Sequence, residues 1–395
     1  MESRETFRYQ KDNKIRNIIV TIVVIALIIG TAYVIYSNFF SNPLKQNVEL
    51  EAGSKLNIKD FIDTSKYKVT VKKGLTKKQA RTVGNHTITL NVKGKDYDAT
   101  VKVVDTAKPV IKGVKKWHVD VNSKNDFKKG VSIEDNANGK TTLKVNTKKL
   151  NMKKEGTYKI TYTAKDASGN TATKTTKVQV SDFAKIAKQK IIYLTFDDGP
   201  SYNTPKILKI LKKYNATGTF FVTGQWPEYF KYITAAHKQG CYIAAHSYTH
   251  NFNIYRSEKA YFDDLNKIEE VIKKYTGKYS QDLRFPGGSS NTVSRHYATG
   301  IMKKLCKEVE KRGYVYVDWN IDSTDASGNN VPVAKLIANG TSTYSKHLCL
   351  LMHDTGAKKT TVKALPKIIE YYKKHGYKFE TLENSPFVYH QRINN

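Results

Sequence analysis

The sequence predicts a multidomain fold: an N-terminal transmembrane helix, two all-β sandwich modules and a C-terminal α/β domain closed into a barrel. Three patterns predict this order. They are an uncharged apolar run over residues 18–36, short alternating strands over residues 47–181, and apolar strands that alternate with amphipathic helices from Lys190 onward. A chain of 395 residues is also too long for one ordinary hydrophobic core, so two or three domains are expected.

The N-terminal run IIVTIVVIALIIGTAYVIY is long enough, as a helix, to cross a bilayer core of about 30 Å. Basic residues precede it, namely Arg4, Arg8, Lys11, Lys14 and Arg16. The positive-inside rule therefore predicts a cytoplasmic tail over residues 1–17, a single-pass anchor over residues 18–40 and an extracellular catalytic domain in a cell-membrane protein. A cleaved signal peptide is the alternative, but the run exceeds a usual signal core and Ser37–Phe40 lacks a small-x-small cleavage pattern.

The formal net charge of +32 is carried mainly by lysine and favours an acidic partner. Anionic wall polymers, lipid headgroups and nucleic acid all fit on charge alone, and a solvated lysine coat is the plain alternative. Nucleic acid ranks last, because base-reading and aromatic-stacking signatures are missing and the expected topology places the chain outside the cytoplasm. The odd number of cysteines, Cys241, Cys306 and Cys349, argues against a disulfide framework.

Residues 44–105 and 106–181 read as two related β modules. Gly84–Val92 aligns with Gly156–Ala164, and each segment is followed by a turn and a Val-x-Val strand, so both modules should end in a hairpin. The second module, which ends in GTYKITYTAKDASGNTATKTTKVQV, resembles the bacterial immunoglobulin-like modules of surface and wall proteins. Attachment to the wall or to a glycan is one interpretation, and a spacer that lifts the next domain off the membrane is the one we favour.

Residues 182–395 alternate strands and helices. Seven strands are expected, at 191–196, 217–223, 241–245, 282–285, 314–319, 348–353 and 377–382. Continuous apolar strands followed by helices indicate a parallel sheet that is covered on both faces, either open or closed into a barrel. Seven strand–helix repeats favour a barrel.

Four of the expected strands end in residues whose side chains could take part in catalysis or bind a metal ion. Asp197 and Asp198 end the first strand, where paired carboxylates usually serve as turn or helix caps. His246 and His250 follow the third strand with a spacing that lets two imidazoles reach one metal ion. Ser247 stands where the zinc-protease motif has its glutamate, so a general base must come from elsewhere.

Arg284 ends the fourth strand and His353 ends the sixth. Alone, an arginine there could close a surface ion pair, and a histidine could be a satisfied core residue. In a βα barrel, however, the carboxyl ends of all strands open onto one face. We therefore expect Arg284 and His353 to converge with the two aspartates and the two histidines.

The motifs TFDDGP, HSYTH, RFPGG and LLMHD, in this order, resemble four of the five motifs of the polysaccharide deacetylases of carbohydrate esterase family four, and the resemblance covers roughly residues 190–385. The resemblance implies a distorted (β/α) barrel, here (β/α)7, and a divalent metal, zinc first with cobalt or manganese as alternatives. It assigns the metal ligands to Asp198, His246 and His250.

The same resemblance implies the other roles. Asp197 would be the general base, Arg284 would orient it, and His353 would be the general acid. Leu351 would line the pocket for the acetyl methyl group. Pro286 and Gly287, which belong to the third motif, are expected to form part of the substrate pocket as well.

The remaining motif of the family, Asp-x-x-Asp-Trp, reads here as Asp322 to Ala326. In this alignment Asp325 tunes His353, and Ala326 replaces the tryptophan that forms one groove wall. A second alignment uses Asp318 and Trp319 instead. We favour Asp325 because Asp318 falls inside a strand pattern, where its side chain would more easily point into packing.

These features predict metal-dependent hydrolytic de-N-acetylation of an extracellular aminosugar polymer, with N-acetylglucosamine in the peptidoglycan of the cell wall as the leading substrate. Poly-N-acetylglucosamine, chitin fragments and acetylxylan are alternatives. A catalytically silent wall-binding protein is the alternative from another class. It is disfavoured because no expected metal ligand and no expected base has been lost from the motifs.

Overall fold

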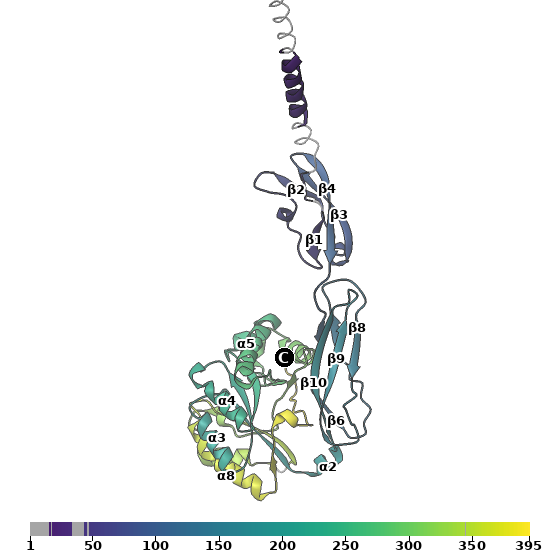
Figure 1. The fold of residues 1–395 in the computed structure, drawn as a ribbon. Helices are drawn as coiled ribbons and strands as arrows, with labels where there is room; N and C mark the ends of the chain where they lie inside the picture. The colour runs from purple at the N-terminus through teal and green to yellow at the C-terminus, as the bar shows by residue number, and fades with distance from the viewer. Residues whose placement is uncertain (1–15, 17, 34–42, 46, 344) are drawn as a thin grey trace, which may run out of the picture. The chain divides into compact units, whose positions relative to one another are not determined.

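The computed structural model describes residue 16 and residues 18–33, 43–45, 47–343 and 345–395 (Figure 1). Residues 18–33 are helical and expose their apolar side chains. A search of these described ranges finds no helix with the length and apolar character needed to span a membrane. Residues 1–15, 17 and 34–40 of the expected tail and anchor lie outside the described residues.

The chain divides into two compact units, Met1–Ala107 with Asp135–Lys140, and Lys108–Glu134 with Thr141–Asn395. The first unit contains one four-stranded sheet in the order β1-β4-β3-β2. Its strands are β1 (Val48–Glu51), β2 (Val69–Lys73), β3 (Gly84–Val92) and β4 (Lys95–Val104), with the short 3-10 helices η1 (Ile58–Asp60) and η2 (Gln79–Arg81) between them. The β3–β4 hairpin expected from the sequence is confirmed.

A two-sheet sandwich was expected for this first module, and the described residues show a single sheet instead. Alternate side chains such as Ile88 and Val101 are fully buried on one face of the sheet. Phe61 and Ile62, which follow η1, belong to the same buried cluster. A second sheet is not needed there because loop side chains already cover the apolar face.

The second module has two sheets, β6-β10-β9-β8 and β5-β7. The strands are β5 (Val110–Lys112), β6 (Trp117–Asp120), β7 (Ser132–Glu134), β8 (Thr142–Asn146), β9 (Gly156–Lys165) and β10 (Thr171–Ser181). Ile111 of the small sheet shares one buried cluster with Ile160 and Val178 of the large sheet. This module is therefore the sandwich that its alternating pattern predicted, and it ends in the expected β9–β10 hairpin.

The α/β part is a parallel sheet in the order β15-β14-β13-β12-β11-β17-β16, with β18 paired to β11 off this path. The strands are β11 (Ile191–Asp197), β12 (Thr219–Thr223), β13 (Tyr242–Ser247), β14 (Asp282–Leu283), β15 (Val315–Tyr316), β16 (Ile321–Asp322), β17 (His347–His353) and β18 (Lys378–Phe379). The helices are α2 (Phe183–Lys188), α3 (Thr204–Lys213), α4 (Lys231–Lys238), α5 (Glu258–Thr276), α6 (Ile301–Lys311), α7 (Val333–Gly340) and α8 (Lys359–Lys374). Figure 1 shows α3, α4, α5 and α8 around the outside of this sheet.

The parallel sheet is confirmed, but it has eight strands where seven were expected, and its membership differs from the expectation. β16 takes the seventh place, and the strand expected at 377–382 is reduced to β18 beside β11. β16 has two residues, which is too short to leave a periodic signal. Among described residues β15 and β16 end the path without pairing with each other, so the barrel is distorted and open there.

The alternation of β11 decides which side chains enter the barrel. Ile192, Leu194 and Phe196 belong to the large cluster shared with the helices, whereas Tyr193 belongs to a second cluster with residues of neighbouring strands. Asp197 has the same parity as Tyr193, so its side chain faces the inside of the barrel. The three cysteines are all buried and free, as expected of small apolar side chains.

Candidate active site

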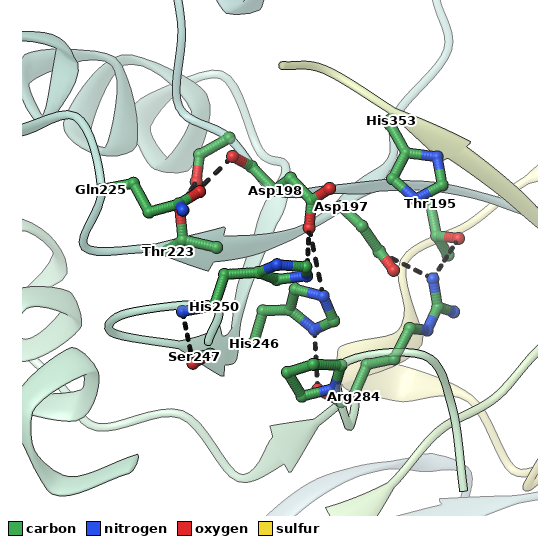
Figure 2. Close-up of polar contacts among 12 residues, drawn as sticks. Thr195, Asp197, Asp198, Thr223, Gln225, His246, Ser247, His250, Arg284 and His353 are labelled. Carbon is green, nitrogen blue, oxygen red and sulfur yellow. Dashed lines mark hydrogen bonds and ion pairs between the residues drawn. The ribbon is translucent and has the colours of Figure 1, made fainter. Parts of the chain in front are cut away.

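The carboxyl ends of the strands bring the expected residues together. Asp197 ends β11 and lies opposite His353 in the register of the parallel β11–β17 pair. His246 lies near the end of β13, and Arg284 directly follows β14. Figure 2 shows His246 beside Asp198, and the guanidinium of Arg284 beside Asp197.

Three side chains form a group that could hold a metal ion. Nε2 of His250 lies 3.0 Å, and Nε2 of His246 lies 3.2 Å, from Oδ1 of Asp198 (Figure 2). All three ligand atoms lie within 4.8 Å of one another. One carboxylate and two imidazoles are a ligand set that suits zinc and leaves coordination positions open.

The hydrogen bonds of this group fit a cation. Nδ1 of His246 lies 2.7 Å from the Arg284 carbonyl oxygen, so it carries the proton and leaves Nε2 with a lone pair. Oδ1 of Asp198 is buried and makes no hydrogen bond within the described residues. The Nε2 lone pair of His246 therefore points at a carboxylate, and a positive ion between them, reached also by Nε2 of His250, would satisfy all three groups, so the residues present fit a divalent metal.

Two of the three residues also hold an uncommon backbone conformation. The φ angle is +70° at Asp198 and +51° at His250, in the left-handed region that most side chains avoid. Such strain is found mainly where the surrounding structure needs a side chain to point in one direction. Here it turns both ligands toward the same point.

Asp264 of α5 was missed by the sequence analysis, although it holds the turn between the two histidines. Its Oδ1 accepts from the Ser247 hydroxyl at 2.6 Å and the Tyr248 amide at 2.7 Å, and its Oδ2 accepts from the Thr249 amide at 3.0 Å and hydroxyl at 2.7 Å. The Ser247 hydroxyl in turn accepts from the amide of His250. A sequence signal existed, because Asp264 falls within the apolar stripe of its helix.

Replacing Asp264 by Asn should lower the free energy of unfolding by about 2–4 kcal/mol, because an amide group facing the Thr249 donors removes hydrogen bonds to a buried charge. Chemical denaturation followed by fluorescence measures this. The matched control is Asp263→Asn on the exposed face of the same helix, where only an ion pair with Lys259 is lost and less than about 0.5 kcal/mol is expected. Equal effects of the two substitutions would contradict the assigned role.

Arg284 is completely buried and holds Asp197 in place. One guanidinium nitrogen donates to Oδ1 of Asp197 at 2.8 Å and to the Thr195 hydroxyl at 2.9 Å. The other two nitrogens donate to the carbonyl oxygens of Val317 and Asp318. With its donors spread over β11 and the segment after β15, this arginine fixes the carboxylate of Asp197 at the barrel mouth.

Asp325 contacts His353, and Asp318 does not. Oδ1 of Asp325 lies 2.7 Å from Nδ1 of His353, and its Oδ2 accepts from the His353 amide at 2.8 Å. Burial lowers the pKa of His353, but the hydrogen bond and charge of Asp325 outweigh it and raise the pKa to about 9. Asp318 instead accepts from the Ser289 and Gln391 amides, where it holds the loop after Arg284.

The residues expected to line the substrate pocket differ in their exposure. Leu351 is buried and lies two residues before His353 on β17, so both share one face of the strand. Pro286 is buried and its carbonyl accepts from the Tyr255 hydroxyl at 2.9 Å. Gly287 is exposed, with a φ of +76°, and Ala326 is exposed as well.

The comparisons with known proteins agree with this geometry. Residues 184–302 match the family model described as polysaccharide deacetylase, and residues 110–180 match the model described as bacterial surface protein, Ig-like domain. A peptidoglycan-N-acetylglucosamine deacetylase of Bacillus cereus is 33% identical over 49% of this chain and 69% of its own length. A peptidoglycan-N-acetylmuramic acid deacetylase of Bacillus subtilis is 32% identical over 52% of this chain and 75% of its own length.

Among solved structures, the catalytic domain of a peptidoglycan N-acetylglucosamine deacetylase from Eubacterium rectale is 43% identical. It superposes with a TM-score of 0.50 over 52% of this chain and 94% of that chain. The fold is a parallel barrel whose strand ends carry paired aspartates and a two-histidine motif. Together with these relatives, it defines the class of the protein as a polysaccharide deacetylase. The chain belongs to the polysaccharide deacetylase family, carbohydrate esterase family four, and is a hydrolase.

Proposed function

We propose that this protein removes the N-acetyl group from N-acetylglucosamine in peptidoglycan, and that it needs a divalent metal to do so. The observation that carries the proposal is the group formed by Asp198, His246 and His250 directly beside Asp197 and its arginine. The similarity to peptidoglycan deacetylases of Bacillus cereus and Eubacterium rectale supports the choice of polymer.

The metal site would be built from Asp198, His246 and His250, with zinc as the proposed ion and cobalt or manganese as substitutes. A divalent cation supplies Lewis acidity, which polarises an acetyl carbonyl and makes water a better nucleophile. The first test is chelation: activity should disappear with a chelator and return on addition of zinc or cobalt. Full activity after the metal has been removed and quantified as absent would contradict the proposal.

The protein side chains then handle the protons. Asp197, held by Arg284 through one carboxylate oxygen, takes the proton of the attacking water. His353 has its Nδ1 against Asp325, so its Nε2 is available to protonate the leaving nitrogen. A sugar amine is a poor leaving group without that proton, and general-acid assistance typically contributes about 10²–10⁴-fold.

The Asp325–His353 contact predicts a pH profile. His353 acts in its protonated form, so kcat/KM should fall as the pH rises through the His353 pKa of about 9. The Asp325→Asn variant lacks the negative charge that raises the pKa of His353, while burial still lowers that pKa. The decrease in kcat/KM should therefore begin at a lower pH than in the wild type. The measurement is kcat/KM against pH for a soluble acetylated chito-oligomer.

Asp318→Asn is the control for this profile, because Asp318 makes its side-chain hydrogen bonds with Ser289 and Gln391 rather than with His353. Its alkaline limb should stay where the wild-type limb lies. The assignment of Asp325 fails if its substitution leaves that limb in place, or if only Asp318→Asn displaces it.

The polymer is tested by acetate release from purified protein. Peptidoglycan should release more acetate than poly-N-acetylglucosamine, chitin fragments or acetylxylan. Ala326 at the place of the family tryptophan is the feature that would favour another polymer, since it removes one groove wall. Release from acetylxylan alone would overturn the proposed substrate, and release from no polymer with an intact metal content would favour a silent wall-binding protein. Muropeptide mass spectrometry with and without the protein gives the test in cells.

We further propose an extracellular catalytic domain, held at the cell membrane by residues 18–40 with the N-terminus in the cytoplasm, and the wall glycan and anionic wall polymers as partners. The basic residues before the apolar run and the surface-protein description of the residue 110–180 match support this location. The second module would act as a spacer. Protease added to intact cells should digest residues 44–395, and protection of these residues would overturn the proposed topology.

A further inference from the structure

A basic cavity lies within the second compact unit, away from the catalytic group. It has a volume of about 440 Å³ and is bordered by β9 and β10 of the sandwich module and by the segments that lead into β13, β14 and β15. The two parts are tied together at its edge, where Lys116 of the module forms a buried ion pair with Asp282 and also donates to the Glu383 carbonyl oxygen. The two walls of the cavity are therefore held together by contacts within this unit.

The charge of the cavity lining is strongly unbalanced. Five cationic residues and one carboxylate, Glu383, contribute to it; the cations are Lys159, Lys174, Lys177, Lys278 and Arg312, and Arg312 is also paired with Glu308 at 3.2 Å. Glu383 is shared between Lys278 at 2.8 Å and Lys177 at 3.3 Å. Within the described residues, Lys159 and Lys174 have no carboxylate within ion-pair distance.

When no anion is bound, repulsion between the lysines of the cavity lining should destabilise the folded state. Lys159 and Lys177 are direct cross-strand partners in the β9–β10 hairpin, and like charges in such a pair repel each other. Lys174 is exposed, and the part of its side chain that is buried lowers its pKa, so its charged form loses some solvation there. A plain solvated coat of lysines would spread these charges apart, whereas an anion in the cavity would offset both effects.

The cavity lies at the opposite end of the barrel from the catalytic group. Tyr242, at the start of β13, lines the cavity, while His246 near the end of the same strand belongs to the candidate metal site. The four residue steps from Tyr242 to His246 span roughly 13 Å along the strand. A ligand held in the cavity therefore leaves the catalytic mouth open to a glycan.

We propose that this cavity binds phosphate groups of an anionic polyol-phosphate polymer. Lysine ammonium groups bind phosphate as point charges, and the lining also presents hydroxyl groups, Thr175 and Tyr279 among them, to a polyol. The volume lies in the range of ordinary ligand pockets, roughly 300–1,000 Å³, and the recessed shape suits a thin polymer chain better than a flat lipid surface. The proposal rests on the proposed wall location and is independent of the deacetylation reaction.

The test measures binding of a fluorescent glycerol-phosphate oligomer to the full chain in non-ionic detergent by anisotropy. The double variant Lys159→Gln and Lys174→Gln should bind at least roughly tenfold more weakly, since two charge-assisted contacts are lost. The matched control is Lys144→Gln with Lys149→Gln, two exposed lysines of the same module outside the cavity, which should change binding less than about twofold. The charge-retaining double variant Lys159→Arg and Lys174→Arg should bind the oligomer as the wild type does.

Three outcomes would overturn the proposal. The first is equal weakening by both pairs of substitutions, which would mean a diffuse lysine coat. The second is equal competition by polyglutamate of the same length, which would remove the preference for phosphate. The third is binding to anionic lipid vesicles without binding to the oligomer. Deacetylation of a soluble chito-oligomer should be the same in every variant, so loss of polymer binding is distinguishable from failure of the proposed reaction.

Discussion

Asp197→Asn should lower kcat by about 10²–10⁴-fold, the usual contribution of a general base, while the divalent metal stays bound. An amide keeps the size of the side chain and can still accept the hydrogen bond of Arg284, but it cannot take a proton from water. Arg284 also keeps its bonds to the Val317 and Asp318 carbonyl oxygens, so the buried guanidinium retains partners. Acetate release and metal content by mass spectrometry, measured on the same sample, test both halves of this prediction.

Asp263→Asn is the control for Asp197→Asn, because it makes the same chemical change on an exposed helix face. It should leave kcat within about twofold of the wild type. Unchanged turnover in Asp197→Asn would remove Asp197 from the mechanism. Loss of the metal in the same variant would instead show that Asp197 acts as a ligand.

His246→Ala should have the second large effect, because it removes metal and activity together. The ring supplies one of three ligand atoms, and its loss should weaken metal affinity by more than the roughly 10–100-fold that follows loss of an outer hydrogen-bond partner. Competition with a chromogenic chelator measures the affinity. Zinc at the concentration that restores the chelated wild type should not restore this variant.

His296→Ala serves as the matched control for His246→Ala, since His296 is exposed and lies outside the candidate ligand group. Both its metal affinity and its turnover should equal those of the wild type. If His246→Ala binds zinc as tightly as this control does, the proposed ligand set is wrong. The same result would remove the physical basis of the proposed mechanism.

The sequence left two candidates for the carboxylate that contacts His353, and the structure shows which of them makes the contact. Asp318 and Asp325 both fit a damaged Asp-x-x-Asp-Trp motif, and no local pattern separates them with certainty. Asp325 begins the 3-10 helix η6 (Asp325–Ser327) and reaches the ring and amide of His353, whereas Asp318 holds the loop after Arg284. The role of Asp325 in tuning the acid stays a prediction for the pH profile.

The amino-acid pattern was enough to predict the βα alternation and the hairpins of both β modules. It also predicted that Asp197, Asp198, His246, Arg284 and His353 lie at strand ends. These features are local: strand periodicity and motif spacing are written in neighbouring residues. Four features could be seen only in the folded domain: β16 completes the sheet, loops replace a second sheet in the first module, Asp264 holds the turn between the histidines, and lysines line a cavity. Each of these depends on contacts between segments far apart in the chain, where packing of the whole domain outweighs local preference.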